Sequence, residues 1–298
     1  DPRFALVHRN LGWAYRHREQ DLRKAIASYE AAQAADPRDA RIVVELDELH
    51  ELAGTPLETR LASLRRDQAA LRARSDGLAR EVLVLSGLGR FDESLDLLEH
   101  NHFHAEELSG AIHDAFVDAH LLRGLQRLSE RNVAGARADF EAAGTYPDNL
   151  EVGRPLRDPR VPQVAYYAAL ARDAAGDSAA ARRLLEHAAG LPHTEGWPET
   201  RAYQAMALAR LGRGAEAAAI FDTVVRAGEA AVAGATEAGA LSRPGTAARE
   251  ASARRLLGLG LLGQGDRSGA RRELARAVAL NGADLWARQH LESLERSP

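Results

Sequence analysis

The chain of 298 residues contains no cysteine. This absence excludes a disulfide framework, a thiolate zinc site and a cysteine nucleophile. It suits a reducing compartment, and we therefore expect a cytoplasmic protein. An excess of charge is also lacking, because 39 basic and 43 acidic residues leave a formal net charge of -4. Proteins that bind nucleic acids or anionic membranes carry a basic excess, so we predict neither partner.

Long apolar runs are missing as well. The longest uncharged apolar stretches, such as Leu256 to Gly265, fall short of the roughly 18 residues that span a bilayer. Aromatic residues make up only 5% of a chain that is 45% hydrophobic, so alanine, leucine and valine must form most of its core. Alanine, leucine, arginine and glutamate favour helices. The composition therefore predicts an all-α protein.

A ladder of small, large and small residues recurs along the chain. In the first copy Ala25, Tyr29 and Ala32 follow one another at helical spacing. The small residues let a neighbouring helix approach closely, and the large residue fills the gap between the two helices. A single helical hairpin of this kind cannot bury its apolar face, so hairpins must stack. The same ladder recurs at Ala136, Phe140 and Ala143, at Ala181, Leu185 and Ala188, at Ala217, Phe221 and Val224, and at Ala270, Leu274 and Ala277.

These ladders, at a period near 34 residues, resemble the tetratricopeptide repeat (TPR). The resemblance implies an all-α, right-handed α-solenoid of about six to seven helical hairpins with a C-terminal capping helix. We expect one superhelical domain over 1–298, with N-terminal repeats and an irregular helix pair in 1–110 and C-terminal repeats in 111–298. The predicted hairpins cover 5–37, 78–100, 116–147, 162–190, 198–227 and 250–281, and the capping helix lies near 283–295.

Three segments depart from this regular pattern. After a helix over 40–53, Thr55 to Glu58 predicts a capping box with Pro56 at the first helical position of a helix that runs to about Arg74. The segment 147–162 holds four prolines and cannot be one helix. The segment 228–245 is rich in alanine and glycine, and its pattern allows either a loop or a helix extension.

A more specific resemblance rests on F-x-x-V-x-R-N-L-G-W-x-Y from Phe4, H-N-H-F-H-A-E from His100 and Y-P-D-N-L-E-V-G-R-P from Tyr146. These segments are similar to the C-terminal repeat region of large bacterial proteins of unknown function. In that family a galactose-mutarotase-like β-sandwich precedes the repeats, which implies a carbohydrate-related role. Because the chain starts at Asp1 without an initiator methionine, we expect a fragment of such a longer protein, with the adjacent β-sandwich as its partner.

The first helix of each repeat hairpin lines the concave side of the solenoid. Tryptophan, tyrosine, methionine and arginine are enriched at recognition surfaces. We therefore predict a non-catalytic scaffold that binds a protein or peptide through this face; the alternative is that residues such as Trp13 and Met206 pack inside the array. The family's inward positions correspond here to Arg9, Trp13, Arg16, Tyr166, Leu170, Asp173, Met206, Arg210, Arg255 and Leu259.

Histidines and carboxylates gather between residues 100 and 120. Such a set can hold zinc or nickel. However, His102 and His104 lack a helical i, i+4 partner, and His113 and His120 lie two helical turns apart. We predict no metal site. One alternative function keeps His104 and Glu107 as a loop site that contributes to a glycan-active centre of the full-length protein, and another makes the repeats a sensing arm of a bacterial regulator.

The run from Gly258 to Gly263 has the spacing of a dinucleotide-binding fingerprint. That motif needs a strand before it and a helix N-terminus after it. Here the run lies inside the first helix of a repeat, so we predict that its glycines permit close helix packing and that the chain binds no cofactor. Acidic pairs, such as Asp47 with Glu51, are expected on solvent-facing helix surfaces.

Overall fold

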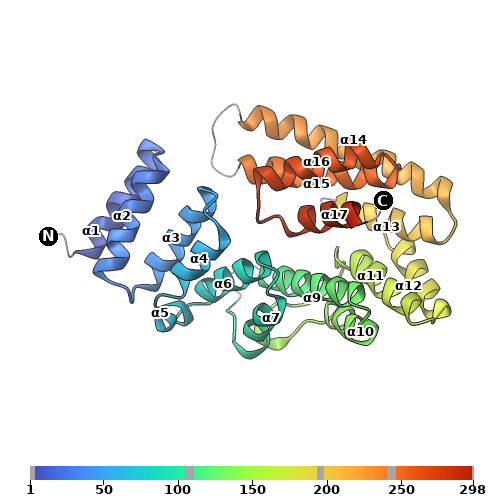
Figure 1. The fold of residues 1–298 in the computed structure, drawn as a ribbon, viewed down its shortest axis with the longest axis horizontal. Coiled ribbons are helices and arrows are strands. Elements are labelled where there is room, and N and C mark those ends of the chain that lie inside the picture. Colours follow the sequence, from blue (N-terminus) through green and yellow to red (C-terminus); the bar gives the residue numbers. More distant parts are fainter. Residues whose placement is uncertain (1–3, 105–110, 193–197, 240–245, 297–298) are drawn as a thin grey trace. The chain divides into compact units, whose positions relative to one another are not determined.

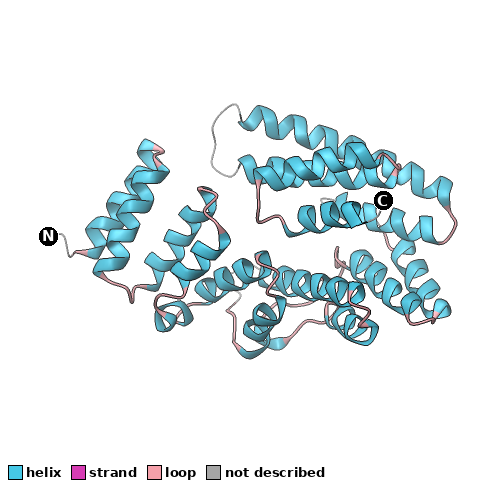
Figure 2. Ribbon diagram, viewed as in Figure 1, coloured by secondary structure: helices cyan, strands magenta, loops and turns pink. Residues whose placement is uncertain are grey.

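The structure is a computed structural model that describes residues 4–104, 111–192, 198–239 and 246–296. These residues form α-helices, one π-helical turn and one 3-10 turn, and none of them forms a strand (Figure 2). The chain divides into two compact units. Unit 1 comprises Asp1–Phe116 with Pro147–Val152, and unit 2 comprises Val117–Tyr146 with Gly153–Pro298. The single superhelical domain expected over 1–298 would include both units, and it stays a prediction.

Unit 1 is a series of short antiparallel helices (Figure 1). Gly12 in the first helix lies against Tyr29 in the second, where an added Cβ would come within 2.5 Å of the ring. This contact is the small-against-large packing that the ladder predicts. In chain order the elements are α1 (Ala5–Ala14), the π-helical turn η1 (Tyr15–Glu19), α2 (Leu22–Ala35), α3 (Ala40–Leu52), α4 (Leu57–Leu64), α5 (Gln68–Arg72), α6 (Ser75–Gly87), α7 (Phe91–His100) and the 3-10 turn η2 (Asp148–Leu150).

The prediction of one long helix after Pro56 is wrong. The helix ends at Leu64, and a new one begins because the Asp67 carboxylate accepts hydrogen bonds from the backbone N–H groups of Ala69 and Ala70. The predicted capping box is wrong as well. Pro56 is itself the N-cap and makes no side-chain cap, while the Thr55 hydroxyl lies 3.1 Å from Nδ1 of His50.

Unit 2 continues the hairpin pattern, and its ladders are buried as predicted. Ala181, Leu185 and Ala188 form one core cluster, while Ala270, Leu274 and Ala277 belong to another. The helix α9 (Ala111–Ser129) enters this unit at Val117. It is followed by α10 (Val133–Ala142), α11 (Val161–Ala174), α12 (Ser178–Gly190), α13 (Pro198–Arg210), α14 (Gly214–Gly239), α15 (Thr246–Gly263), α16 (Arg267–Leu280) and α17 (Leu285–Arg296).

Glycines shape both the turns and the helix contacts of unit 2. Gly176, between α11 and α12, has a φ of +79°, a left-handed conformation that favours glycine. Inside α15, a Cβ at Gly258 would lie 2.8 Å from Leu274, and one at Gly260 would lie 2.7 Å from Val225. The prediction that this glycine run permits close helix packing is therefore confirmed.

The undecided segment 228–245 is helical up to Gly239, because α14 continues to that residue; the remainder lies outside the described residues.

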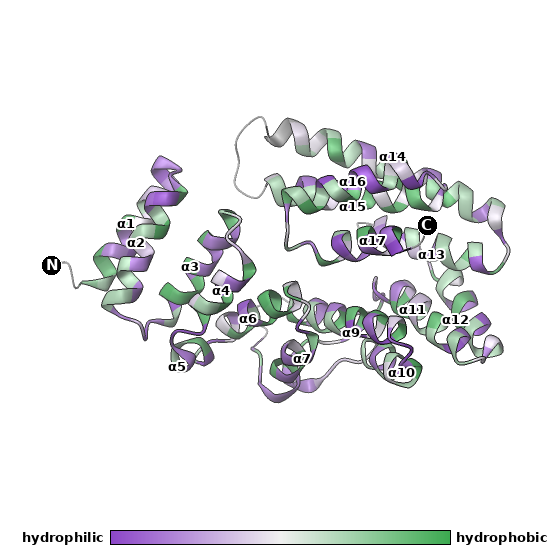
Figure 3. Cartoon of the chain, viewed as in Figure 1, coloured by the Kyte–Doolittle hydropathy of each residue, from purple (hydrophilic) through white to green (hydrophobic). Residues whose placement is uncertain are grey.

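Hydrophilic and hydrophobic residues alternate along individual helices, as amphipathic packing requires (Figure 3). Within the described ranges, no helix combines the length and the hydropathy that a membrane crossing requires.

Candidate functional site

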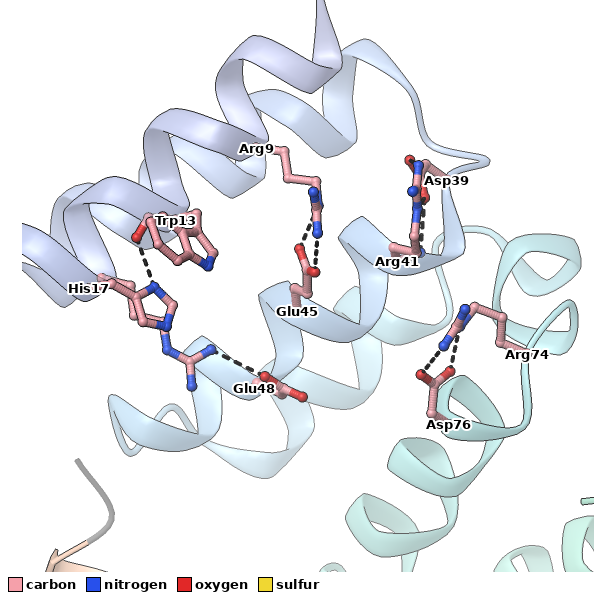
Figure 4. A network of polar contacts seen from close by, with 10 residues as sticks. Arg9, Trp13, His17, Asp39, Arg41, Glu45, Glu48, Arg74 and Asp76 are labelled. Atoms are coloured by element: carbon pink, nitrogen blue, oxygen red, sulfur yellow. Dashed lines mark hydrogen bonds and ion pairs between the residues drawn. The ribbon is translucent and has the colours of Figure 1, made fainter. Parts of the chain in front are cut away.

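The first candidate surface lies on α1 and α3 of unit 1 (Figure 4). Arg9 donates from Nε to the Glu45 carboxylate at 2.7 Å, and Arg16 donates to the Glu48 carboxylate at 3.2 Å. Arg9 and Trp13 share one side of α1 at helical spacing, and Arg16 follows in the π-helical turn η1. We call the set Arg9, Trp13, Arg16, Glu45 and Glu48 the N-terminal face. The structure thus brings three predicted binding residues together with two carboxylates.

Trp13 is the exposed aromatic residue of this face. Its side chain is 47% exposed, and its ring stacks on His17 with 4.4 Å between ring centroids. His17 is held in place because its Nδ1 lies 2.9 Å from the Trp13 carbonyl oxygen. The alternative in which Trp13 packs inside the array is wrong, because the indole is open to solvent in the described structure.

Apolar side chains cover much of the rest of α1. Among the described residues eight large hydrophobic side chains are exposed, and five of them lie between positions 4 and 13. No acidic residue occurs from Phe4 to Arg18, so this surface is apolar with basic neighbours. We call it the α1 apolar surface, and its members are Phe4, Leu6, Val7, Leu11 and Trp13. At helical spacing Val7 and Leu11 share one side of the helix with the N-cap residue Phe4, and Leu6 and Trp13 share the adjoining side.

The inner face of unit 2 is filled by the chain's own residues. Trp286 of α17 stacks on Tyr167 with 5.6 Å between ring centroids, and its Nε1 donates to Asp118 at 2.8 Å. Tyr203 accepts a hydrogen bond from Gln163 at 2.9 Å, and its hydroxyl oxygen lies 3.5 Å from Nε2 of His290. The inner face comprises Gln163, Tyr167, Tyr203, Trp286 and His290, all of which are buried.

This packing decides where the predicted binding residues of unit 2 lie. Leu259 is only 1% exposed and packs with Ala202, Val224 and Leu256, so its placement on an open face is wrong. Close packing on the adjoining glycines draws α15 against its neighbours and buries this leucine. Met206 is half-buried beside the same cluster, which agrees with the alternative that it packs inside the array.

The remaining predicted residues of unit 2 lie at its edges. Asp173 and Arg210 are exposed and form an ion pair at 3.3 Å. Tyr166 and Leu170 are half-buried on α11. Arg255 is 14% exposed and bridges two carboxylates. Its partners are Glu199 at 2.8 Å and Asp284 at 3.0 Å.

Two buried carboxylates have structural partners. Asp47 is 1% exposed and accepts hydrogen bonds from Arg60 and Arg80, which contradicts the expected solvent-facing position. Burial alone would raise the pKa of Asp47, but the two guanidinium groups lower it below its usual value. Asp139 has a similar role among His120, Arg123 and Arg127. His120 therefore serves the packing of unit 2.

The loop after α7 brings two histidines to a distant carboxylate. His102 Nε2 lies 2.7 Å from Oε1 of Glu151, and His104 Nδ1 lies 3.5 Å from the same oxygen. Glu151 is 49 residues from His102 in sequence, so no local spacing could have identified it. Glu107, the second predicted loop residue, lies outside the described residues. His100 pairs with Asp96 at 3.2 Å, apart from this group.

No protein-family profile matches the chain. Among solved structures, it resembles a tetratricopeptide repeat protein from Parabacteroides merdae at 17% identity, a TM-score of 0.51 and 98% coverage of both chains. The C-terminal part of a TPR repeat-containing protein from Cytophaga hutchinsonii is 12% identical, with coverage of 95% and 99% and a TM-score of 0.42. Pseudomonas aeruginosa pilF is 17% identical over 74% of this chain and 90% of its own, with a TM-score of 0.43. The Parabacteroides protein confirms the predicted all-α TPR solenoid fold.

Proposed function

We propose that this chain is a non-catalytic scaffold that binds a protein partner through α1 and α3 of unit 1. One observation carries the proposal, namely the concentration of exposed large apolar side chains in the α1 apolar surface. Covering a half-exposed side chain of this size contributes on the order of 1 kcal/mol, so five neighbouring ones can support a specific interface. Exposed apolar patches rimmed by polar groups are typical of protein-binding sites.

The N-terminal face supplies the polar rim for such an interface. Its arginines and carboxylates are already paired, Arg9 of α1 with Glu45 and Arg16 of η1 with Glu48, so a partner need not provide full counter-charges. Trp13, stacked on His17, offers a rigid aromatic surface at its centre. Aromatic anchors of this type carry a large share of binding energy at interfaces.

We further propose that the partner is the adjacent β-sandwich domain of a longer, cytoplasmic, carbohydrate-related protein, and that the repeats are its accessory module. Support comes from the sequence resemblance that begins at Phe4, within the α1 apolar surface. In this proposal the reaction, where there is one, takes place on the neighbouring domain.

A photo-crosslinking amino acid, p-benzoylphenylalanine, tests the proposal when placed at Val7 in the native gene product. Val7 is 51% exposed in the α1 apolar surface. The matched control is Leu83 of α6, which is similarly exposed, at 45%, and does not belong to the α1 apolar surface. We expect irradiation in the source cells to link Val7, and not Leu83, to one protein surface, identified by mass spectrometry of the linked peptides.

The same experiment separates the two levels of the proposal. A link to a β-sandwich of the same polypeptide supports the accessory module, whereas a link to a separate protein supports the scaffold and rejects that partner. Equal links from both positions, or none from Val7, would reject the α1 apolar surface as a binding site.

A further inference from the structure

Two exposed histidines in unit 1 flank a buried phenylalanine in the loop after α7. Between them, Phe103 is fully buried. While Phe103 points into the core, His102 and His104 both reach solvent and contact each other. Both imidazoles are more than half exposed, at 53% and 62%, and their ring centroids lie 4.9 Å apart.

The backbone that carries these histidines is fixed at both ends of Phe103. The Phe103 N–H donates to the Asn149 carbonyl at 2.8 Å, and the His104 N–H donates to the Ser75 hydroxyl at 2.9 Å. The Asn149 side chain in turn donates to the carbonyls of Leu98 and Asn101 at 2.8 and 2.6 Å. These bonds hold residues 147–152 against the histidine segment.

Glu151 then projects its carboxylate toward both rings. It ends the turn η2 in a left-handed conformation, with a φ of +50°. Its Oε1 lies 2.7 Å from His102 Nε2 and 3.5 Å from His104 Nδ1, and the three potential ligand atoms all lie within 4.8 Å of one another. Two imidazole nitrogens and one carboxylate oxygen therefore lie close together on the surface of unit 1.

We propose that His102, His104 and Glu151 form a binding site for a divalent transition metal, with zinc as the best-matched ion. Tetrahedral zinc holds nitrogen and oxygen ligands at about 2.0–2.1 Å, which places the ligand atoms about 3.3 Å from one another. The two distances to Glu151 lie on either side of that value. Because all three ligand atoms lie within 4.8 Å of one another, binding brings the imidazole nitrogens closer by at most about 1.5 Å, which rotation of exposed side chains permits.

The donor set also selects among metals. Imidazole suits zinc, nickel and copper, whereas calcium and magnesium prefer sites made of oxygen ligands. Three protein ligands leave a fourth position for water. A bound ion would join two segments of unit 1 that are 49 residues apart, and so clamp residues 147–152 in place.

Cobalt(II) titration of the full chain without an affinity tag tests the site, because tetrahedral cobalt gives strong visible absorption bands. We expect one equivalent to saturate these bands with a dissociation constant below about 100 µM, and zinc to displace the cobalt. His102→Gln and Glu151→Gln should each weaken binding at least about tenfold. The matched control is His100→Gln, an exposed histidine two residues away that pairs with Asp96.

Circular dichroism confirms that each variant keeps its helical content. The absence of saturable cobalt bands in the wild-type chain would overturn the proposal. So would binding that survives both substitutions, or that His100→Gln weakens equally, because the metal would then lie elsewhere. The photo-crosslinking result at Val7 does not depend on this site, so the two proposals can fail separately.

Discussion

The N-terminal face of unit 1 and the inner face of unit 2 differ in how far their aromatic residues reach solvent. Trp13 in unit 1 is 47% exposed, whereas Trp286 in unit 2 is 7% exposed. Both faces are built from helices of the same repeat pattern. A TPR-type sequence therefore predicts which residues line a face. Whether solvent reaches that face depends on how the rest of the chain packs against it.

The helix α17 accounts for the filled face of unit 2. It delivers Trp286 onto Tyr167 and His290 next to Tyr203. In the described part of unit 1, no helix plays the same role over Trp13, which stacks only on its neighbour His17. The proposed binding surface therefore lies in unit 1.

The largest expected effect comes from exchanging the two tryptophans for alanine. Trp286→Ala should lower the free energy of unfolding by about 3–5 kcal/mol, because it removes a buried stacked ring and leaves a cavity. Trp13→Ala should change it by less than about 0.5 kcal/mol, since an exposed ring loses little packing. Urea unfolding followed by circular dichroism measures both, and equal losses would contradict the contrast between the faces.

A second contrast concerns arginines. Arg255→Gln should cost about 3 kcal/mol, because it leaves Glu199 and Asp284 without their shared cation in a mostly buried setting. Arg9→Gln should cost less than about 1 kcal/mol, because its pair with Glu45 is partly open to solvent. The same urea measurement applies. A loss at Arg9 as large as that at Arg255 would mean that the N-terminal face is structural.

Low pH should destabilise the inner face of unit 2, because it favours protonation of the buried His290. Burial, with a smaller contribution from the positive charge of Arg255, lowers the pKa of His290 to about 3. The folded-state pKa is therefore below the unfolded value of about 6.5, and the unfolded state binds the extra proton between these values. Stability is fully present above that window and falls as the pH decreases into it, by at most about 1.4 kcal/mol per pH unit.

His290→Gln should remove this contribution and flatten the dependence of the urea midpoint on pH between about 7 and 5. In this range Asp47 and Asp139 stay ionised, because their pKa values are lowered below the usual carboxyl value. An unchanged slope in the variant would show that His290 does not govern the acid response.

The smallest effect sharpens the comparison of turns within unit 2. Arg131 has a φ of +62°, whereas Gly176 and Gly212 supply the left-handed conformation in later turns. Arg131→Gly should stabilise the chain by about 0.5–1 kcal/mol, since it removes the Cβ clash of the left-handed backbone. Gly176→Ala should destabilise it by about 1 kcal/mol. Thermal unfolding measures both shifts, and a lower melting temperature for Arg131→Gly would contradict this account.

The hairpins could be predicted because their determinants are local. Each ladder, such as Ala181, Leu185 and Ala188, is written into one helix and needs only a neighbour in sequence. The end of the helix at Leu64 could not be predicted from the local pattern. It depends on the Asp67 carboxylate, which caps a new helix by accepting hydrogen bonds from the N–H groups of Ala69 and Ala70.

The candidate sites depend on distant contacts and were therefore only partly predictable. The resemblance to TPR proteins places Arg9, Trp13 and Arg16 on the concave side, and it places Leu259 there as well. The burial of Leu259 follows from the way α15 packs onto other helices. Glu151 carries no local signal at all, because its meeting with His102 depends on hydrogen bonds that return residues 147–152 to unit 1.

The contact between Trp286 and Asp118 has a consequence for how unit 2 comes apart. An ordinary solenoid is held by nearest neighbours and can fray one repeat at a time from either end. Here Trp286 of α17 donates a hydrogen bond to Asp118 of α9, 168 positions earlier, so α17 cannot detach without breaking its contact with α9. Unit 2 should therefore lose its amide-exchange protection in one cooperative step, as a globular domain does, while folding slowly because its closing contact joins such distant parts of the chain.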